Sequence, residues 1–157
     1  MAKALKEGDQ IPDIELATPS GGQVALRSYA GRPLVLYFYP KDDTSGCTRE
    51  AQDFSRLYPE FREAGAEVLG VSKDAPAKHL KFIDKYDLTV PLASDTEDKA
   101  TDAFGTWVQK QLYGKTYMGI DRSTFLFNAG GRLIRSWRKV RVPGHAIEVL
   151  EAVKQLA

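Results

Sequence analysis

The single cysteine of this chain, Cys47, is the side chain best suited to covalent chemistry. It follows a polar loop, residues 41–46, and precedes apolar residues that recur at helical spacing: Ala51, Phe54 and Tyr58. We therefore expect the thiol in the first turn of a helix, where unpaired N–H groups and the positive end of the helix dipole stabilise a thiolate. The alternative is an inert core thiol, because counting back along the same pattern places Cys47 on the apolar face of the helix.

The charges around Cys47 bear on its reactivity. Three nearby acidic residues would disfavour a thiolate if their carboxylates approached it: Asp42, Asp43 and Glu50. A reactive site therefore needs a compensating cation, and the sequence leaves three candidates open: Lys41, Arg49 and, from the far end of the chain, Arg122. Thr44 stands where a helix N-cap would fall, so its hydroxyl could either cap the helix or point at the thiolate.

The composition is that of an ordinary globular protein, with 43% hydrophobic and 27% charged residues. The 157 residues suit one domain, so we expect residues 1–157 to form a single unit. The net charge is +1 and basic residues are interleaved with acidic ones, which argues against a nucleic-acid partner. Residues 1–10 lack the apolar run of a signal peptide, and no stretch approaches the roughly 18 apolar residues of a membrane span. We therefore expect a cytoplasmic protein without a membrane partner.

The same inventory bears on metals and cofactors. One cysteine excludes an intramolecular disulfide and a cysteine-cluster metal site, and the two histidines, His79 and His145, show no metal-ligand spacing. We therefore expect chemistry without a bound metal or cofactor. His145 is expected to cap or pack at the last helix, and Trp107 and Trp137 are expected in the core or in a pocket wall.

The first two thirds of the chain show alternating strand and helix patterns. Strands are expected at 13–17 and 23–26, joined as a hairpin by Ser20-Gly21-Gly22, and then at 34–39, 68–71 and 90–93. Helices are expected at 45–64, from Pro76 onward with Leu80, Ile83 and Tyr86 facing inward, and at about 97–107. Strand 34–39 is almost wholly apolar or aromatic, which suits a central strand covered on both faces.

The last third of the chain changes character. Residues 109–116 indicate a polar, glycine-containing connection. Residues 124–127 and 133–137 flank Asn128-Ala129-Gly130-Gly131, which predicts an antiparallel hairpin, and residues 144–156 predict an amphipathic helix with Ile147, Leu150 and Val153 facing inward.

A parallel βαβ half followed by an antiparallel ββα half is the thioredoxin-like α/β plan. The expected fold is therefore a mixed central sheet flanked by helices, here with an N-terminal β-hairpin extension. Reactive groups in open α/β sheets gather at the carboxyl ends of the strands, and the loop from Pro40 to Cys47 lies at such an end.

Residues 40–50, Pro-Lys-Asp-Asp-Thr-Ser-Gly-Cys-Thr-Arg-Glu, resemble the active-site motif of the peroxiredoxins, proline-x-x-x-threonine-x-x-cysteine, in the wording of the bacterioferritin comigratory protein (PrxQ) subfamily. Further similar segments follow at the right distances: Tyr113-Gly114-Lys115, residues 119–126, and residues 137–140 with Gly144-His145. The resemblance spans almost the whole chain.

This resemblance implies a thiol-dependent peroxidase and assigns roles residue by residue. Cys47 matches the peroxidatic cysteine, which attacks hydrogen peroxide or an organic hydroperoxide and becomes a sulfenic acid. Thr44 and Arg122 match the residues that bind the peroxide, so the implied catalytic residues are Cys47, Thr44 and Arg122. Pro40 matches the residue that shields the pocket, and Gly46 belongs to the same substrate-binding segment. The implied role is antioxidant defence and redox homeostasis.

The chain departs from the subfamily in lacking a resolving cysteine. Many relatives carry one five residues after the peroxidatic cysteine, where this chain has Gln52, and others carry it near Phe82 and Ile83. The resemblance therefore implies a one-cysteine enzyme that needs an external thiol reductant: thioredoxin, glutaredoxin with glutathione, or a small thiol. We expect a monomer or weak homodimer.

Three other functions remain as alternatives. A peroxide-sensing redox switch or chaperone would use oxidation of Cys47 without efficient turnover. A thioredoxin-like exchange protein would normally need a Cys-x-x-Cys pair, which is absent here. A glutathione peroxidase shares the fold, but the segment around Cys47 is similar to the peroxiredoxin motif instead.

Overall fold

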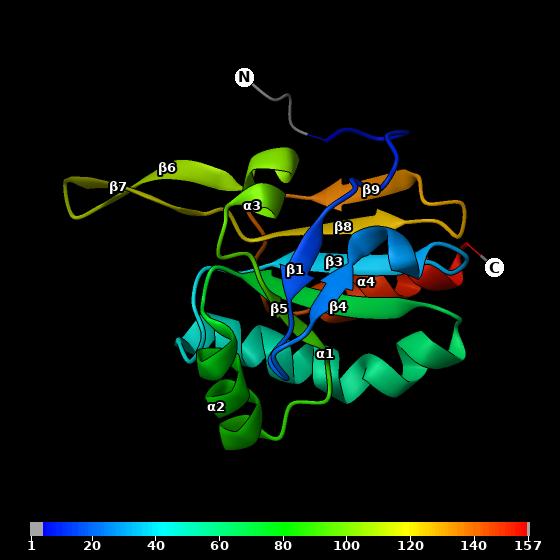
Figure 1. The fold of residues 1–157 in the computed structure, drawn as a ribbon, viewed down its shortest axis with the longest axis horizontal. Coiled ribbons are helices and arrows are strands. Elements are labelled where there is room, and N and C mark those ends of the chain that lie inside the picture. Colours follow the sequence, from blue (N-terminus) through cyan, green and yellow to red (C-terminus); the bar gives the residue numbers. More distant parts are fainter. Residues whose placement is uncertain (1–4, 157) are drawn as a thin grey trace.

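The chain folds around a mixed seven-stranded sheet, with a separate two-stranded hairpin that projects from one side (Figure 1). The computed structural model describes residues 5–156, so residues 1–4 and 157 of the expected single unit lie outside the described part. The sheet has the order β2-β1-β5-β4-β3-β8-β9. Its strands are β1 Glu15–Ala17, β2 Gln23–Ala25, β3 Leu34–Phe38, β4 Glu67–Ser72, β5 Leu92–Ser94, β8 Ser123–Phe127 and β9 Leu133–Trp137. The helices are α1 Ser45–Glu63, α2 Pro76–Tyr86, α3 Lys99–Phe104 and α4 His145–Lys154, with a short 3-10 helix at Leu26–Tyr29.

The strand pairing has the two predicted halves. β3, β4 and β5 are parallel neighbours connected by α1 and α2, whereas β8 and β9 run antiparallel, β8 against β3. β1 and β2 form the predicted N-terminal hairpin, and β1 extends the sheet beyond β5. Within residues 5–156, no helix is long and apolar enough to cross a membrane.

β3 is the predicted central strand, and its side chains alternate between two cores. Val35 and Tyr37 pack in the cluster formed with α1 and α4. Leu34, Leu36 and Phe38 pack in the opposite cluster, which includes residues of α3 and the 3-10 helix. All five residues of β3 are buried. Because the strand is fixed on both faces, its carboxyl end is a rigid starting point for the loop that leads to Cys47.

The region after β5 corrects the sequence analysis. The predicted helix 97–107 is only six residues long and ends at Gly105, whose φ is 65°. The predicted polar connection is in fact a β-hairpin, β6 Trp107–Leu112 paired with β7 Lys115–Ile120. Tyr113 and Gly114 form its two-residue turn with φ values of 51° and 76°. Two positive φ angles match the turn that best fits the twist of a two-stranded ribbon, and this signal was missed.

One predicted inward position in each of two helices is wrong. The other predicted positions do face the core: Leu150 and Val153 of α4 are buried, and Ile83 and Tyr86 of α2 are partly buried against it. Leu80 of α2 and Ile147 of α4 are each 51% exposed. The buried positions of α2 are His79 and Phe82, and those of α4 are His145, Ala146, Val149, Leu150 and Val153. In both helices the inward face begins at a histidine, and a pattern search that follows apolar residues does not count a buried polar side chain.

Candidate active site

Cys47 lies in the first turn of α1, beyond the carboxyl end of β3, as predicted. The residue is 1% exposed and belongs to the apolar cluster between the sheet and the helices α1 and α4. Its position therefore combines both expectations, because the thiol is buried in the core and also stands at a helix N-terminus. What separates it from an inert core thiol is a cationic neighbour.

That neighbour is Arg122, in the short connection between β7 and β8. Its Nη2 atom donates to the Cys47 sulfur at 3.3 Å, and its Nη1 atom donates to Glu50 Oε1 at 2.6 Å. Burial acts to lower the pKa of Arg122, but Glu50 and Cys47 outweigh it and raise that pKa above its usual value. The planar guanidinium reaches both groups at once, which a lysine ammonium would not reproduce. The structure thus brings together residues that are 75 positions apart in the sequence.

Glu50 is the acidic member of this group, and its full burial was not foreseen. Its side chain is 1% exposed, and its Oε2 atom has no hydrogen-bond partner among the described residues. Burial raises the pKa of Glu50 from 4.5 to about 7, although Arg122 opposes the shift. The carboxyl group therefore changes charge near neutral pH while it is bonded to the guanidinium that contacts Cys47. Its spacing, three residues after Cys47 on the same helix, was the available signal.

Gly46 explains how Arg122 comes so close to the first turn of α1. A Cβ atom added at Gly46 would lie 3.2 Å from Arg122 Nη2, tighter than ordinary van der Waals contact. The missing side chain leaves room for the guanidinium over the helix N-terminus.

Thr44 is the N-cap residue of α1, but its hydroxyl makes neither of the two expected contacts. The hydroxyl donates to the Lys41 carbonyl at 2.9 Å, so it neither caps a helix N–H nor contacts the sulfur. The Thr44 carbonyl accepts the N–H of Thr48 at 2.8 Å and so closes the first turn. Thr44 is exposed, and its hydroxyl lies on the loop that precedes Cys47.

Pro40 and the other two candidate cations line two hollows. Pro40 and Lys41 line a mostly apolar hollow of about 380 Å³ whose other wall includes Trp107, Tyr117 and Met118 of the β6–β7 hairpin. Arg49 lines a different hollow of about 400 Å³, shared with Gln52, Arg56 and the start of α4. Among the described residues, the cation that contacts the Cys47 sulfur is Arg122, not Lys41 or Arg49.

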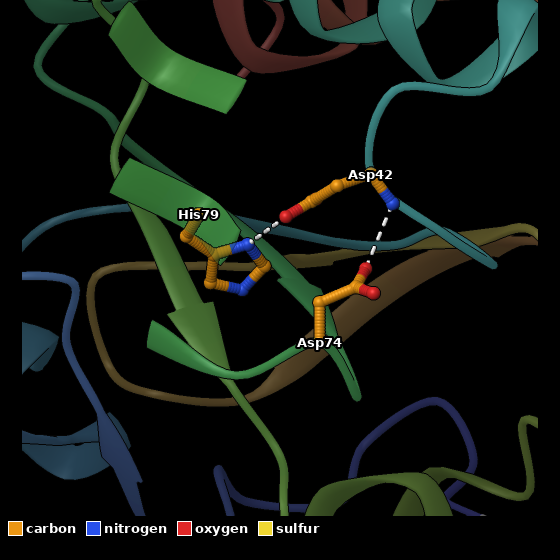
Figure 2. A group of neighbouring side chains, drawn as sticks. All are labelled: Asp42, Asp74 and His79. Atoms are coloured by element: carbon orange, nitrogen blue, oxygen red, sulfur yellow. Dashed lines mark hydrogen bonds and ion pairs between the residues drawn. The ribbon is translucent and has the colours of Figure 1, made fainter. Parts of the chain in front are cut away.

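A second polar group holds the loop before Cys47 (Figure 2). His79 Nδ1 lies 2.6 Å from Asp42 Oδ2, and the Asp42 backbone N–H donates to Asp74 Oδ2 at 2.7 Å. The ligand-type atoms of these three residues lie within 4.8 Å of one another, which makes them the group that could hold a metal ion. The facing atoms already bond one another or neighbouring groups, so we assign no metal to them. The sequence offered no signal for this pairing, because Asp42 and His79 are 37 positions apart.

His145 packs at the start of α4, as expected. Its Nε2 atom lies 2.8 Å from Thr124 Oγ1, and its ring lies edge-on to Phe54 and Trp137. Burial lowers the pKa of His145 from 6.5 to about 4, so the ring is neutral at physiological pH. The indole of Trp137 donates to Glu148 at 2.5 Å, while Trp107 is 40% exposed beneath the Lys73 ammonium.

A family model and the sequences of similar proteins indicate the same protein family. Residues 7–136 match the AhpC/TSA family. A peroxiredoxin Bcp from Bacillus subtilis is 47% identical over 153 residues, with 98% of each chain covered. A peroxiredoxin Bcp from Xanthomonas campestris is 48% identical and covers 90% of this chain and 89% of its own.

Solved structures agree with these sequences. A structure of Xanthomonas campestris peroxiredoxin Q superposes with a TM-score of 0.86 at 48% identity, covering 91% of this chain and 90% of that one. A cysteine-to-serine mutant of Xylella fastidiosa PrxQ gives a TM-score of 0.92 at 38% identity, with 98% of each chain covered. Another structure, whose subject is the alkyl peroxide reduction activity of the Xanthomonas campestris bacterioferritin comigratory protein, gives 0.87 at 45% identity and covers 94% of this chain and 98% of that one. The predicted fold class is thereby confirmed.

Proposed function

The chain belongs to the AhpC/TSA family and is a peroxiredoxin, a thiol-dependent peroxidase, and on this premise we propose that Cys47 is the residue that hydroperoxides oxidise. The contact of Arg122 Nη2 with the Cys47 sulfur is the observation that carries the proposal. A guanidinium at this position favours the thiolate, which is the nucleophilic form of the thiol. It also places donors where a peroxide would meet the sulfur.

In the oxidation step the Cys47 sulfur attacks one peroxide oxygen. A sulfur–oxygen bond forms, the oxygen–oxygen bond breaks, and the second oxygen leaves with the bonding electrons as hydroxide or alkoxide. That anion takes up a proton to become water or an alcohol, and Cys47 is left as a sulfenic acid. Preorganised donors aimed at the oxygens stabilise the charge as it moves. Arg122 supplies one such set of donors, and the unpaired N–H groups of the first turn of α1 supply another.

The ionisation state of Glu50 determines how strongly the Arg122 guanidinium stabilises the Cys47 thiolate. When Glu50 is ionised, the guanidinium is shared between its carboxylate and Cys47. When Glu50 is protonated, the positive charge facing Cys47 is no longer opposed. Because the pKa of Glu50 lies at about 7, both forms are populated near neutral pH.

The loop residues complete the proposed substrate site. The Thr44 hydroxyl, which now bonds the Lys41 carbonyl, can turn about its χ1 angle to donate to a bound peroxide. Gly46 leaves room for Arg122, and Pro40 shields the site from the side of the β6–β7 hairpin. The substrates are hydrogen peroxide and organic hydroperoxides, and the relative from Xanthomonas campestris is associated with alkyl peroxides.

The reduction step needs an external thiol, because the chain has no second cysteine. The donor thiol displaces water from the sulfenic acid to give a mixed disulfide, and a second donor thiol then releases Cys47 as the thiol. At 1% exposure Cys47 is accessible to a small peroxide only by a narrow approach, so a bulkier donor requires the first turn of α1 to open. Thioredoxin, glutaredoxin with glutathione, and small thiols are the candidate donors. A cytoplasmic location and a monomeric or weakly dimeric state remain predictions.

Steady-state peroxide consumption tests this function. Hydrogen peroxide and cumene hydroperoxide should be supplied with each of three donors: thioredoxin with its reductase, glutaredoxin with glutathione, and dithiothreitol. We expect multiple turnovers with at least one donor, and none with Cys47→Ser. A single equivalent of peroxide consumed with every donor would contradict the enzyme and would favour a redox switch or chaperone that uses Cys47 oxidation without turnover.

A further inference from the structure

Asp42 and His79 form a buried pair beside the active-site loop (Figure 2). Both side chains are 0% exposed, and their atoms Oδ2 and Nδ1 are 2.6 Å apart. The remaining polar atoms are also engaged. Tyr39 donates its hydroxyl to Asp42 Oδ1 at 2.5 Å, and His79 Nε2 lies 3.0 Å from the Ala93 carbonyl. The pair therefore joins α2 to the loop and to the end of β3.

Counting donors shows that the pair holds one shared proton. A carbonyl can only accept a hydrogen bond, so His79 Nε2 carries a hydrogen that it donates to Ala93. The short contact between Nδ1 and Oδ2 then requires one further hydrogen between them. With that hydrogen the bond is charge-assisted or a strong neutral bond, and both side chains are satisfied. A pair of this kind is costly to break, because each partner would be left unsatisfied in the interior.

The pair controls the backbone that leads into α1. Asp42 stands between Pro40 and Thr44, and its backbone N–H is held by Asp74 at 2.7 Å. The next residue, Asp43, has a φ of 60° and bonds Lys85 at 2.8 Å and the hydroxyl of Tyr86. The loop is thus tied to α2 at two successive residues. Of these two links, the Asp42–His79 pair is the more buried, because the Asp43 side chain is 41% exposed.

We propose that Asp42 and His79 are positioning residues, which hold the first turn of α1 in the arrangement that reacts with peroxide and resist the opening that a thiol donor needs. The proposal rests on the proposed function. It makes the two half-reactions respond in opposite directions. Oxidation needs Cys47 under Arg122 with the first turn intact, whereas reduction needs the buried sulfenic acid to become accessible. Weakening the pair raises the population of the opened form, and this slows the first step and speeds the second.

The experiment measures the two half-reactions separately on the full chain. Stopped-flow kinetics give the rate of Cys47 oxidation by hydrogen peroxide, and the rate at which dithiothreitol reduces the preformed sulfenic acid. In Asp42→Asn the amide oxygen can still accept from Tyr39 and the amide nitrogen can donate to His79 Nδ1, so every hydrogen bond survives in neutral form. We expect reduction to accelerate by about threefold, because neutral hydrogen bonds are roughly half as strong as charge-assisted ones. Oxidation should slow by a smaller factor, because the closed form still predominates.

His79→Asn is the stronger perturbation. Its amide nitrogen can take the place of Nδ1, but the bond to the Ala93 carbonyl is lost. We expect reduction to accelerate by about tenfold and oxidation to slow by a smaller factor. If the two residues act as one unit, the double variant should change the rates by less than the product of the single effects. Circular dichroism and urea unfolding establish that each variant is folded. If His79→Asn does not fold, the isosteric Asp42→Asn carries the test alone.

Asp87→Asn is the matched control, since it makes the same chemical change on α2 at an exposed C-cap residue with a φ of 51°, a conformation that asparagine tolerates. Both of its rates should stay at the wild-type values. Equal slowing of both half-reactions in Asp42→Asn, or no change in either, would overturn the positioning role while leaving the peroxidase intact. A wild-type protein that peroxide does not oxidise would instead overturn the proposed function itself.

Discussion

Two buried polar pairs lie near Cys47 and differ in how completely their hydrogen-bonding groups are satisfied. In the Arg122–Glu50 pair the Arg122 side chain is 16% exposed, the Oε2 atom of Glu50 has no partner among the described residues, and Arg122 contacts the sulfur. In the Asp42–His79 pair both side chains are fully buried, and each side-chain polar atom has a hydrogen-bond partner other than Cys47. The Arg122–Glu50 pair can therefore change its charge or its contacts during a reaction, whereas the Asp42–His79 pair stays fixed.

Substitutions in the two pairs should therefore have different effects. A change in the Arg122–Glu50 pair should alter the rate of Cys47 oxidation and the pH dependence of that rate, because the Arg122 charge faces the sulfur. A change in the Asp42–His79 pair should alter the conformation of the loop before α1 and, through the loop, both half-reactions. Effects should be largest at the Arg122–Glu50 pair and smaller at the residues around it.

The largest effect should follow removal of the guanidinium. We expect Arg122→Met to slow oxidation of Cys47 by about 100- to 1,000-fold, as loss of one preorganised donor group typically does. Stopped-flow oxidation by hydrogen peroxide measures the rate, and the ultraviolet absorbance of the thiolate against pH reports the ionisation of the sulfur. Arg135→Met, at a half-exposed arginine of β9, is the matched control and should change the rate by less than about twofold. A wild-type rate in Arg122→Met would mean that another cation activates Cys47.

The next effect is on stability against pH and concerns Glu50. Its pKa is raised from 4.5 to about 7 by burial, so the folded state favours the protonated form. The stability that this provides is fully present below pH 4.5 and is lost as pH rises towards 7, by about 2 to 3 kcal/mol. We expect Glu50→Gln to flatten the pH dependence in this window, measured by urea unfolding at several pH values between 4.5 and 8.

Glu60→Gln, an exposed glutamate on the same helix, is the control for this measurement. It should leave the pH dependence of the wild type in place. Equal loss of stability by Glu50→Gln and the wild type as pH rises through this window would show that the Glu50 carboxyl group does not titrate near neutral pH. The Arg122–Glu50 and Asp42–His79 pairs would then differ only in how many of their polar atoms are hydrogen-bonded.

The sequence was sufficient for the plan of the sheet but not for the β6–β7 hairpin. Strand and helix periodicity located β3, α1 and the antiparallel β8–β9 pair, because each carries a continuous apolar pattern that fits one period. The hairpin carries no such pattern, since most of its side chains face solvent, and only its Tyr113-Gly114 turn marks it. Leu80 of α2 and Ile147 of α4 were wrongly placed inward, because each helix also turns a buried histidine towards the core.

For the site, local spacing predicted the place of Cys47 but not its partners. The position of Cys47 in the first turn follows from residues within about ten positions of it. The choice of Arg122 over Lys41 and Arg49 depends on contacts made across the fold, which spacing cannot supply, and only the family resemblance pointed to it. The Asp42–His79 pair was not predicted, because neither a motif nor a periodicity links an aspartate in the loop before α1 to a histidine in α2.

A smaller effect should arise at His145, a third buried polar contact near the site. Its pKa is lowered from 6.5 to about 4, so the neutral ring is favoured in the folded state. The stability that this provides is present above pH 6.5 and is lost as pH falls towards 4, by about 2 kcal/mol or less once solvent screening is considered. We expect His145→Gln, whose amide can still bond Thr124, to lose less stability between pH 7.5 and pH 4.5 than the wild type does. A wild-type acid profile in this variant would assign the acid sensitivity to other groups.

The smallest effect should follow Arg49→Met. Arg49 is exposed and faces the hollow next to Gln52, not the sulfur, so solvent screens its charge from Cys47. We expect the rate of oxidation to change by less than about twofold in stopped-flow kinetics. A loss comparable to that of Arg122→Met would show that the cation requirement is met by the general charge of the region and not by one directed contact.

The central claim is that Cys47, activated by Arg122, takes one oxygen from a peroxide and keeps it until an external thiol arrives. Mass spectrometry of the intact protein after brief exposure to one equivalent of hydrogen peroxide tests this most directly. Because the chain has no second cysteine that could condense with the sulfenic acid, we predict that one oxygen atom is added at Cys47 and that dithiothreitol removes it. An unmodified Cys47 in protein shown to be folded would contradict the account.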